Sequence, residues 1–149
     1  MPIVRGCNLP DDLLYDVDNH TWYSELGDGT VRMGMTAVAT ALAGELVAFT
    51  PKKIGREVKA GKSCATIESG KWVGPARSAA DGEVVAVNVA LVDQPNLANH
   101  DPYELGWMIV LRPENWDSVR AALTPGSEVT SRYEAKMDAD AFDGCAAAQ

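Results

Sequence analysis

Apolar and polar residues alternate along most of this chain in short runs, a pattern typical of β-strands rather than of long helices. Each run is bounded by glycine, proline, asparagine or aspartate, as strands joined by turns usually are. The predicted strands are residues 22–23, 30–33, 45–49, 63–70, 82–88 and 107–111. Gly27–Gly29 and Asp81-Gly82 carry the strongest turn signals between them. The pattern therefore predicts a mainly β fold.

Three short helices are predicted beside these strands. Thr36 suits the N-cap of an alanine-rich helix, and Gly44 suits its end. The predicted helices span residues 36–43, 114–123 and 129–142. In the last of these, Tyr133 and Met137 lie four positions apart on a partly apolar face, which is expected to pack on the body. Residues 93–106 are rich in asparagine and proline and are predicted to form a loop.

The length of 149 residues fits one domain with a core of its own. We expect two small antiparallel sheets in a barrel-like sandwich. Residues 44–49 and 82–87 share Gly-Glu and Ala at matching places, which is consistent with two related halves. The predicted parts are an irregular N-terminal segment (1–19), a central domain (20–123), and a C-terminal helix and tail packed on it (124–149).

Charge and hydropathy narrow the classes of partner. Acidic residues outnumber basic ones, 21 to 13, for a formal net charge of −8. Nucleic-acid binding requires clustered lysine and arginine, so no nucleic-acid partner is predicted. The acidity either steers the chain to basic docking surfaces on partner enzymes or serves solubility alone. No apolar run is long enough to span a bilayer, and the N-terminus resembles no signal peptide, so the predicted location is cytoplasmic with no membrane partner.

The cysteines and histidines indicate no metal site and no catalytic group. The three cysteines are an odd number without CxxC spacing, so neither a disulfide framework nor zinc is predicted. Cys64 is predicted to be a small buried residue of a strand, whereas Cys7 and Cys145 lie near opposite ends in segments predicted to be exposed. His20 and His100 are the only histidines. Neither is close in sequence to a serine nucleophile, which disfavours Ser-His catalysis.

Glu68–Lys71 is the most informative motif, because it places a lysine at a turn between the strands 63–70 and 82–88. The simplest interpretation is a solvated loop charge. Against it, Gly70 permits a positive φ or the close approach of another chain, and Trp72 puts a large apolar group at an exposed tip. A lysine amine, with a reference pKa near ~10.4, must be bound and deprotonated before it is acylated, which requires a protruding tip. The sequence therefore predicts that Lys71 is modified.

These residues resemble the lipoyl carrier family, in particular the H-protein of the glycine cleavage system. The similarity runs from about His20 to Leu123. Matching segments are His20–Trp22, Gly34–Val47, Glu68–Lys71, Asp81–Asn88 and residues 95–107. The resemblance implies a barrel-sandwich hybrid of the lipoyl and H-protein type, with short peripheral helices and a C-terminal helix. It also implies that Lys71 lies at an exposed hairpin tip.

The resemblance further implies that lipoate is the cofactor, in amide linkage to Lys71. Glu68, Ser69, Gly70 and Trp72 would then be read by the modifying enzyme, a lipoate-protein ligase or a lipoyl transferase. Dihydrolipoamide dehydrogenase is a further implied partner. The chain would be a carrier and not an enzyme, since the cofactor supplies the redox chemistry and the protein supplies docking and orientation.

Departures from the usual pattern point to a narrower group. Ordinary H-proteins have valine before and alanine after the lysine, where this chain has Gly70 and Trp72. Together with Arg5–Cys7 and the tail carrying Cys145, these features are similar to the H-protein-like lipoate-binding proteins of bacterial sulfur oxidation. That similarity implies an arm carrying sulfur-containing intermediates or electrons, with subunits of a heterodisulfide-reductase-like complex as partners. This role is favoured over the alternative, an aminomethyl carrier in glycine cleavage.

Several alternatives stay open. Cys7 and Cys145 either exchange with the lipoyl dithiol or a partner persulfide, if the termini meet, or are exposed bystanders. His100 and Asp101 either contact the arm or, as favoured, serve as turn and hydrogen-bonding residues. A scaffold protein without lipoate is less favoured because the Glu-Ser-Gly-Lys tip is intact. A biotin carrier is least favoured, because such sites place methionine on both sides of the lysine.

Overall fold

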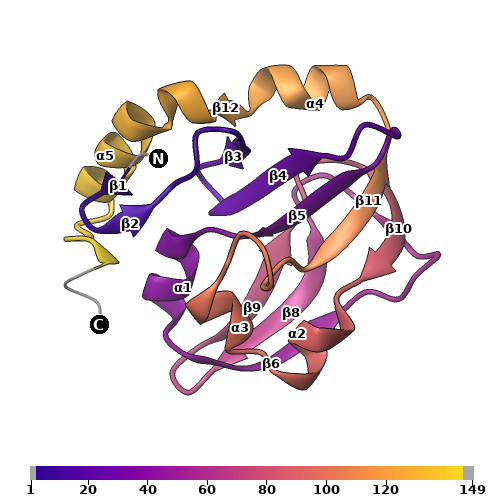
Figure 1. Ribbon diagram of the computed structural model, residues 1–149, viewed down its shortest axis with the longest axis horizontal. Helices are drawn as coiled ribbons and strands as arrows, with labels where there is room; N and C mark the ends of the chain where they lie inside the picture. The colour runs from indigo at the N-terminus through magenta and orange to yellow at the C-terminus, as the bar shows by residue number, and fades with distance from the viewer. Residues whose placement is uncertain (1–2, 146–149) are drawn as a thin grey trace.

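Two antiparallel sheets face one another and form a flattened sandwich with helices along its rim (Figure 1). The computed structural model describes residues 3–145. The larger sheet contains, in spatial order, β12 (Thr124–Pro125), β3 (Leu14–Asp16), β4 (Thr21–Glu25), β5 (Val31–Met35), β11 (Ile109–Pro113), β10 (Gly82–Val87) and β7 (Glu57–Val58). The smaller sheet contains β6 (Leu46–Pro51), β8 (Ser63–Ser69) and β9 (Val73–Arg77). β1 (Ile3–Val4) and β2 (Cys7–Asn8) pair with each other.

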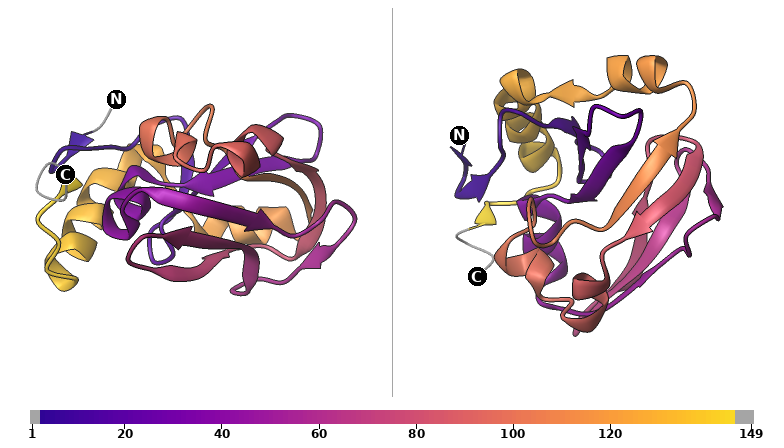
Figure 2. Two further views of the ribbon diagram at one scale, coloured as in Figure 1. Left: turned by 90° about the horizontal axis from the view of Figure 1, so that it is seen from below. Right: turned by 45° about the vertical axis from the view of Figure 1, so that its right-hand side comes forward.

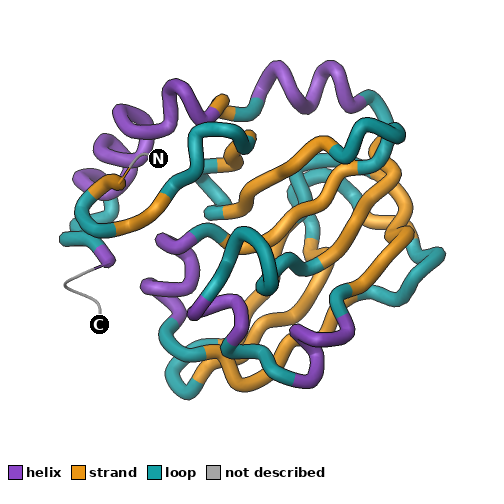
Figure 3. The backbone as a smooth tube through the Cα atoms, in the orientation of Figure 1, coloured by secondary structure: helices purple, strands orange, loops and turns teal. Residues whose placement is uncertain are grey.

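The helices lie outside the sheets (Figure 3). They are α1 (Ala37–Ala43), α2 (Val89–Asp93), α3 (Leu97–His100), α4 (Trp116–Ala122) and α5 (Val129–Ala139), with a 3₁₀ turn at Gly126–Glu128. Two views place α4 and α5 along one side of the molecule and α2 and α3 on the other (Figures 1 and 2). The site described below is built around α1, which joins the two sheets.

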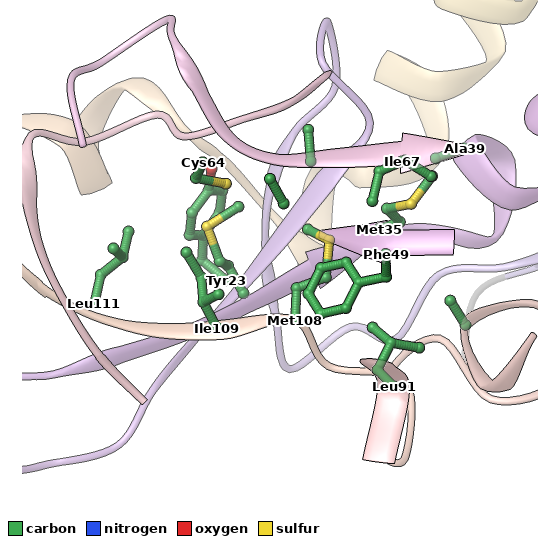
Figure 4. Packing of buried hydrophobic residues seen from close by; sticks show 14 of the residues in the cluster. Tyr23, Met35, Ala39, Phe49, Cys64, Ile67, Leu91, Met108, Ile109 and Leu111 are labelled. Atoms are coloured by element: carbon green, nitrogen blue, oxygen red, sulfur yellow. The ribbon is translucent and has the colours of Figure 1, made fainter. Parts of the chain in front are cut away.

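The larger of two apolar clusters fills the space between the sheets and is called the barrel core here. Its side chains come from both sheets (Figure 4), such as Phe49 and Ile67 from the smaller sheet and Tyr23 and Ile109 from the larger. From Ala65 to Ser69 in β8, the buried positions Ala65, Ile67 and Ser69 alternate with the exposed positions Thr66 and Glu68. This alternation fixes which face of the hairpin points away from solvent.

The second cluster, called the terminal cap here, joins the two ends of the chain to α1. β1 and β2 lie beside α5 in Figure 1, and the cluster includes side chains of both. The buried members of the cap are Val4, Cys7, Leu9, Leu13, Tyr15, Val17, Trp22, Val38, Val129, Tyr133, Met137 and Cys145.

The predicted fold class is confirmed, and so are several local details. Thr36 caps α1, since its hydroxyl accepts a hydrogen bond from the Ala39 amide at 3.2 Å. Gly44 ends the helix with φ of +84°, a conformation that favours glycine. Tyr133 and Met137 face the body of the protein as predicted, both almost fully buried. Cys64 lies buried in β8, and burial raises the pKa of its thiol to about 12.

Three local predictions are wrong. In the segment predicted to be irregular, residues 3–19 contain three short strands, of which β1 and β2 pair with each other and β3 pairs with β4 and β12. Residues 93–106 are not simply a loop, because they include the end of α2 and all of α3. The strand that follows the lysine turn is β9 rather than residues 82–88. This strand was missed because Pro75 disfavours a strand in the sequence pattern. Proline is tolerated here because β9 lies at an edge of its sheet.

The last four residues of the predicted C-terminal tail, 146–149, lie outside the described part of the chain. Across residues 3–145, no helix is long and apolar enough to cross a membrane. The same residues contain no group of three or more histidine, cysteine or acidic side chains placed to hold a metal ion.

Candidate functional site

Lys71 lies in the turn between β8 and β9, and the hairpin holds it out from the barrel. The Ser69 amide donates to the Trp72 carbonyl at 2.8 Å, which closes a tight connection around Gly70 and Lys71. Ser69 itself is 5% exposed, and its hydroxyl accepts from the Lys71 amide at 3.3 Å. Ser69 therefore shapes the turn, whereas Glu68, Gly70 and Lys71 are exposed to an approaching protein.

The conformational reason expected for Gly70 is wrong. Gly70 does not have a positive φ, and a Cβ atom added to it would meet nothing within 4 Å. No strain and no close contact within the described chain requires glycine here. What Gly70 does provide is an open flank on the N-terminal side of Lys71.

Trp72 folds back along the hairpin instead of extending into solvent. A Cβ atom added to Gly74 would collide with the Trp72 indole, so the absence of a side chain at this position lets the ring lie against β9. Trp72 is 39% exposed and borders a cavity that Lys71 also borders. The ring therefore forms one wall of the space next to the lysine.

The side chain of Lys71 lies over the end of α1. A Cβ atom built on Gly44 would be 3.2 Å from the Lys71 Cε atom, so glycine leaves room for the stem of the lysine. Asn99 of α3 fixes this turn, because its amide donates to the Gly44 carbonyl at 2.9 Å and its oxygen accepts from the Leu46 amide at 2.9 Å. The role of Asn99 was not predicted, although Asn99 lies in the segment 95–107 that resembles the family.

An apolar cleft of about 470 Å³ opens beside Lys71, between α1 and the start of β9. Its lining includes Leu42, Ala43 and Met35 on one side and Trp72 and Pro75 on the other. A flexible, largely aliphatic group attached to Lys71 would find apolar walls within reach. This cleft was not predicted, because its walls come from segments distant in sequence.

His20 is one of the polar side chains that line this cleft. Its Nδ1 atom lies 3.1 Å from the Tyr133 hydroxyl, and the two rings stack with centroids 5.7 Å apart. Burial lowers the pKa of His20, and the Lys136 cation lowers it further. The imidazole is therefore neutral at pH 7 and joins the cleft to the terminal cap.

A second cavity, the polar groove, lies along the other side of α1. It measures about 640 Å³ and runs from Gly44 and Glu45 to Cys145. Asp101 borders it and is a turn residue, as favoured, since its carboxylate accepts from the amides of Glu104 and Leu105. His100 also borders this groove and does not line the cleft beside Lys71.

The predictions for Cys7 and Cys145 are corrected by the structure. Both are buried rather than exposed, and they form a disulfide with Cα atoms 5.1 Å apart. Odd cysteine number and spacing gave no sign of this bond. The reason is that 138 positions separate the pair and only the terminal cap brings them together.

The chain is similar in sequence to known proteins. Residues 13–136 match the family model described as "Glycine cleavage H-protein". The chain belongs to this family. It is 48% identical over 132 residues to "Glycine cleavage system H protein 5" of Aquifex aeolicus, covering 86% of this chain and 88% of the relative. It is 35% identical over 136 residues to "Probable glycine cleavage system H protein 2" of Sulfurisphaera tokodaii, covering 90% and 92%.

A solved structure agrees with the sequence relatives. The crystal structure of a glycine cleavage system H protein from Mycobacterium marinum superposes with a TM-score of 0.72 and 34% identity, covering 83% of this chain and 97% of that one. Members of the glycine cleavage H-protein family bind lipoate on a lysine and are carriers. The residues present here fit such a group, because an exposed lysine at a hairpin tip stands beside an apolar cleft.

Proposed function

We propose that this chain is a lipoyl carrier and that Lys71 is the lysine that bears lipoate. The observation that carries the proposal is the position of Lys71, exposed at the β8–β9 tip with its stem over Gly44 and the apolar cleft at its side. When bound, lipoate supplies a dithiolane that is interconverted with a dithiol. The chain's own residues hold the lysine outward, give the aliphatic arm an apolar surface, and present the tip to partner enzymes.

The tip also supports a proposal for the modifying enzyme. A lipoate-protein ligase or lipoyl transferase would read Glu68 and Trp72, whose side chains are accessible on either side of Lys71, and would use the open flank at Gly70. Ser69 would act indirectly by holding the turn. Dihydrolipoamide dehydrogenase is the proposed partner for reoxidation of the arm, and a cytoplasmic location suits this set of partners.

For the cargo, the names of the relatives favour the glycine cleavage system. In that role the arm would carry an aminomethyl group between a decarboxylase and an aminomethyltransferase. The relatives from Aquifex aeolicus and Sulfurisphaera tokodaii are both named as glycine cleavage H proteins. This support comes from names of similar proteins, so reconstitution with the partner enzymes is needed to test it.

Sulfur transfer with a heterodisulfide-reductase-like complex is the second candidate, and three observations favour it. The lysine is flanked by Gly70 and by Trp72, whose ring needs Gly74 beneath it, so the tip presented to partners has its own shape. In addition, a disulfide borders a groove that begins at the turn beneath Lys71. Three relatives also come from one organism, Aquifex aeolicus, and are numbered 5, 2 and 3, which leaves room for more than one role.

The test of the carrier is intact mass and peptide mapping of the protein produced in a host that lipoylates its other carriers. We expect one lipoyl adduct, on Lys71, which Lys71→Arg removes and the matched Lys62→Arg keeps. An unmodified Lys71 in such a host would contradict the proposal and favour a scaffold. For the cargo, incubation with glycine and a decarboxylase of the glycine cleavage type should add an aminomethyl group to the arm. A sulfur adduct in protein from cells grown on thiosulfate would select the second candidate.

A further inference from the structure

The two ends of the chain are held together beside α1 by more than the Cys7–Cys145 bond. The Cys145 amide donates to the Arg5 carbonyl at 3.0 Å. Gly144 has φ of +131°, and a Cβ atom there would collide with the Arg5 carbonyl, so glycine is required for this approach. The Arg5 guanidinium also donates to Asp138 at 2.5 Å and to the Phe142 carbonyl at 3.1 Å. These contacts keep the segments in place when the disulfide is open, which lets the bond break and re-form.

Cys145 is the half of this disulfide that borders the polar groove. It is 6% exposed, whereas Cys7 is fully buried. An attacking thiolate would therefore meet the Cys145 sulfur. The reduced state also has a partner ready, because the Ala37 carbonyl oxygen lies 3.6 Å from the Cys145 Sγ atom and can accept a hydrogen bond from its thiol.

The other end of the groove is Gly44, over which Lys71 lies. Helix α1 separates the two ends and has seven residues, so at about 1.5 Å per residue it measures roughly 10 Å. An extended chain advances about 1.2 Å per bond, so the about seven to nine bonds from a lysine Nζ to the sulfurs of lipoamide span roughly 8 to 11 Å. A dithiol on Lys71 therefore matches the length of the groove.

The charge of the groove selects among thiols. Glu45, Asp101 and Glu104 border it, and no lysine or arginine among residues 3–145 lines it. Lys71, which lies over Gly44 at its end, is uncharged once it is acylated. Anionic thiols such as glutathione or free dihydrolipoate are repelled by this surface, whereas a neutral dithiol amide is not. The groove thus suits an uncharged dithiol.

We propose that the Cys7–Cys145 disulfide is a redox-active site that accepts two electrons from an uncharged dithiol in the polar groove, and that the dithiol on Lys71 is its natural donor. The last part rests on the proposed function. The Cys7–Cys145 S–S bond breaks and one S–S bond forms between the two sulfurs of the dithiol. Two electrons and two protons pass from the dithiol to the cysteine pair, which becomes two thiols. No other oxidant or reductant is needed.

The predicted compartment is consistent with this role. Disulfides that persist are rare among cytosolic proteins, and those that do form there are usually transient and catalytic or redox-sensing. A buried pair backed by hydrogen bonds and bordering the groove at Cys145 fits the transient class. One such exchange returns a reduced arm to its disulfide form and leaves Cys7 and Cys145 as two thiols.

The test uses the lipoylated full-length protein, in which both the Cys7–Cys145 bond and the dithiolane of the lipoyl group start as disulfides. Dihydrolipoamide dehydrogenase and NADH reduce the arm, acid and an alkylating agent stop the reaction, and peptide mass spectrometry reports the thiol state of Cys7, Cys145 and the arm. We expect Cys7 and Cys145 to become alkylated at a rate independent of protein concentration. For a flexible tether the effective concentration is on the order of millimolar, so free dihydrolipoamide at about 10 µM should act roughly 100-fold more slowly on Lys71→Arg.

Two variants probe the groove. Ala41 of α1 borders it, and Ala41→Phe should slow reduction of the pair, while Ala121→Phe, on the exposed face of α4, should not. Should Ala41→Phe fail to fold, Glu45→Gln serves instead, because Glu45 is exposed. Removing this charge should speed reduction by anionic dihydrolipoate and leave the rate with neutral dihydrolipoamide unchanged.

The outcomes separate the two proposals. If Lys71 carries lipoate and the arm is fully reduced while Cys7 and Cys145 stay joined, the inference is overturned and the carrier function stands. If Lys71 carries no lipoate, free dihydrolipoamide still tests the site on the unmodified chain. The inference would also be overturned if the rate at which Cys7 and Cys145 are reduced were the same in Ala41→Phe as in wild type and the same for neutral and anionic dithiols.

Discussion

The barrel core and the terminal cap are built from contacts of different range. In the barrel core, β4 pairs with β5 and β8 with β9, and each pair is joined by a short turn. In the cap, the Cys7–Cys145 bond spans 138 positions and the Arg5–Asp138 hydrogen bond spans 133. The hairpin that presents Lys71 is therefore formed by neighbours in sequence, although the sheets around it also include distant pairs such as β5 with β11. The region that closes over α1 is assembled from the chain ends.

This difference suggests separate roles for the two regions. The hairpin must be rigid, since it holds a lysine for recognition, and its position follows from the buried alternation in β8. The cap determines what lies on either side of α1. The cap reaches the apolar cleft through Tyr133, which contacts the cleft residue His20, and it reaches the polar groove through Cys145. We therefore expect damage to the cap to alter the surroundings of the arm without displacing Lys71.

The largest effect is expected from removing one buried methionine in each region. Met33 of β5 lies in the barrel core and Met137 of α5 lies in the cap, and both are at most 1% exposed. Met33→Ala and Met137→Ala should each lower the free energy of unfolding by about 2–5 kcal/mol, because each leaves a cavity. Chemical denaturation gives the size of each loss.

Hydrogen exchange then distinguishes the two variants. Met137→Ala should speed exchange in α5, β1 and β2 while β8 and β9 keep their protection, whereas Met33→Ala should weaken both regions. If Met137→Ala lost protection from hydrogen exchange equally in all strands and helices, the cap and the barrel would open as one unit. The two regions would then not be independent.

The disulfide should contribute next most. Closing a loop of this length restricts the unfolded chain, and such bonds typically add about 2–4 kcal/mol. Replacing Cys7 and Cys145 together by serine should remove that amount, and a reducing agent should lower the wild type to the same value. The reducing agent should leave the free energy of unfolding of the double variant unchanged. A decrease in the double variant would show that the reducing agent acts on something other than this disulfide.

The range of contacts also explains how much could be predicted from the sequence. Thr36, Gly44 and the strand 63–69 were found because a cap, a helix end and an alternating pattern are each visible within a few residues. The lysine tip was found in the same way. The strand β9 was missed because Pro75 opposes it locally, and only its place at the sheet edge makes it possible.

Features that depend on distant partners could not be predicted. Asn99 clamps the turn under Lys71 from more than 50 positions away, at sequence separations of 55 and 53. Neither cavity is visible in the sequence, since each takes its walls from several segments. Cys7 and Cys145 could be considered as a pair only on the condition that the termini meet, and hydrophobic pattern alone does not decide that.

A smaller effect is expected from His20, whose pKa is lower in the folded protein than in the unfolded chain. Burial lowers its pKa, Lys136 lowers it further, and Asp140, Asp16 and Asp18 oppose the shift more weakly. Below pH ~6.5 the unfolded chain therefore binds a proton at His20 more readily than the folded protein does. The free energy of unfolding consequently decreases as the pH falls from about 7. In His20→Asn this part of the pH dependence should disappear. Asparagine suits the position, where φ is 57°.

Urea unfolding of both proteins at pH 7 and at successively lower pH checks this. As the pH falls from 7, the free energy of unfolding of the wild type should decrease relative to that of His20→Asn. A difference that stays constant with pH would mean that the pKa of His20 is the same in the folded and unfolded states. The cap is the region concerned, because the His20 ring lies against Tyr133.

The smallest effect on stability is expected at Trp72, although its effect on the arm should be clear. Trp72 is 39% exposed, so Trp72→Ala should change the free energy of unfolding by no more than about 0.5 kcal/mol. Trp116→Ala should cost more, because that indole donates to Glu25 at 2.9 Å and packs on Tyr23 with centroids 6.1 Å apart. Trp72→Ala also removes a wall of the apolar cleft, so the lipoylated variant should be reduced faster by an external thiol. Identical rates in Trp72→Ala and wild type would show that the arm does not rest against this wall.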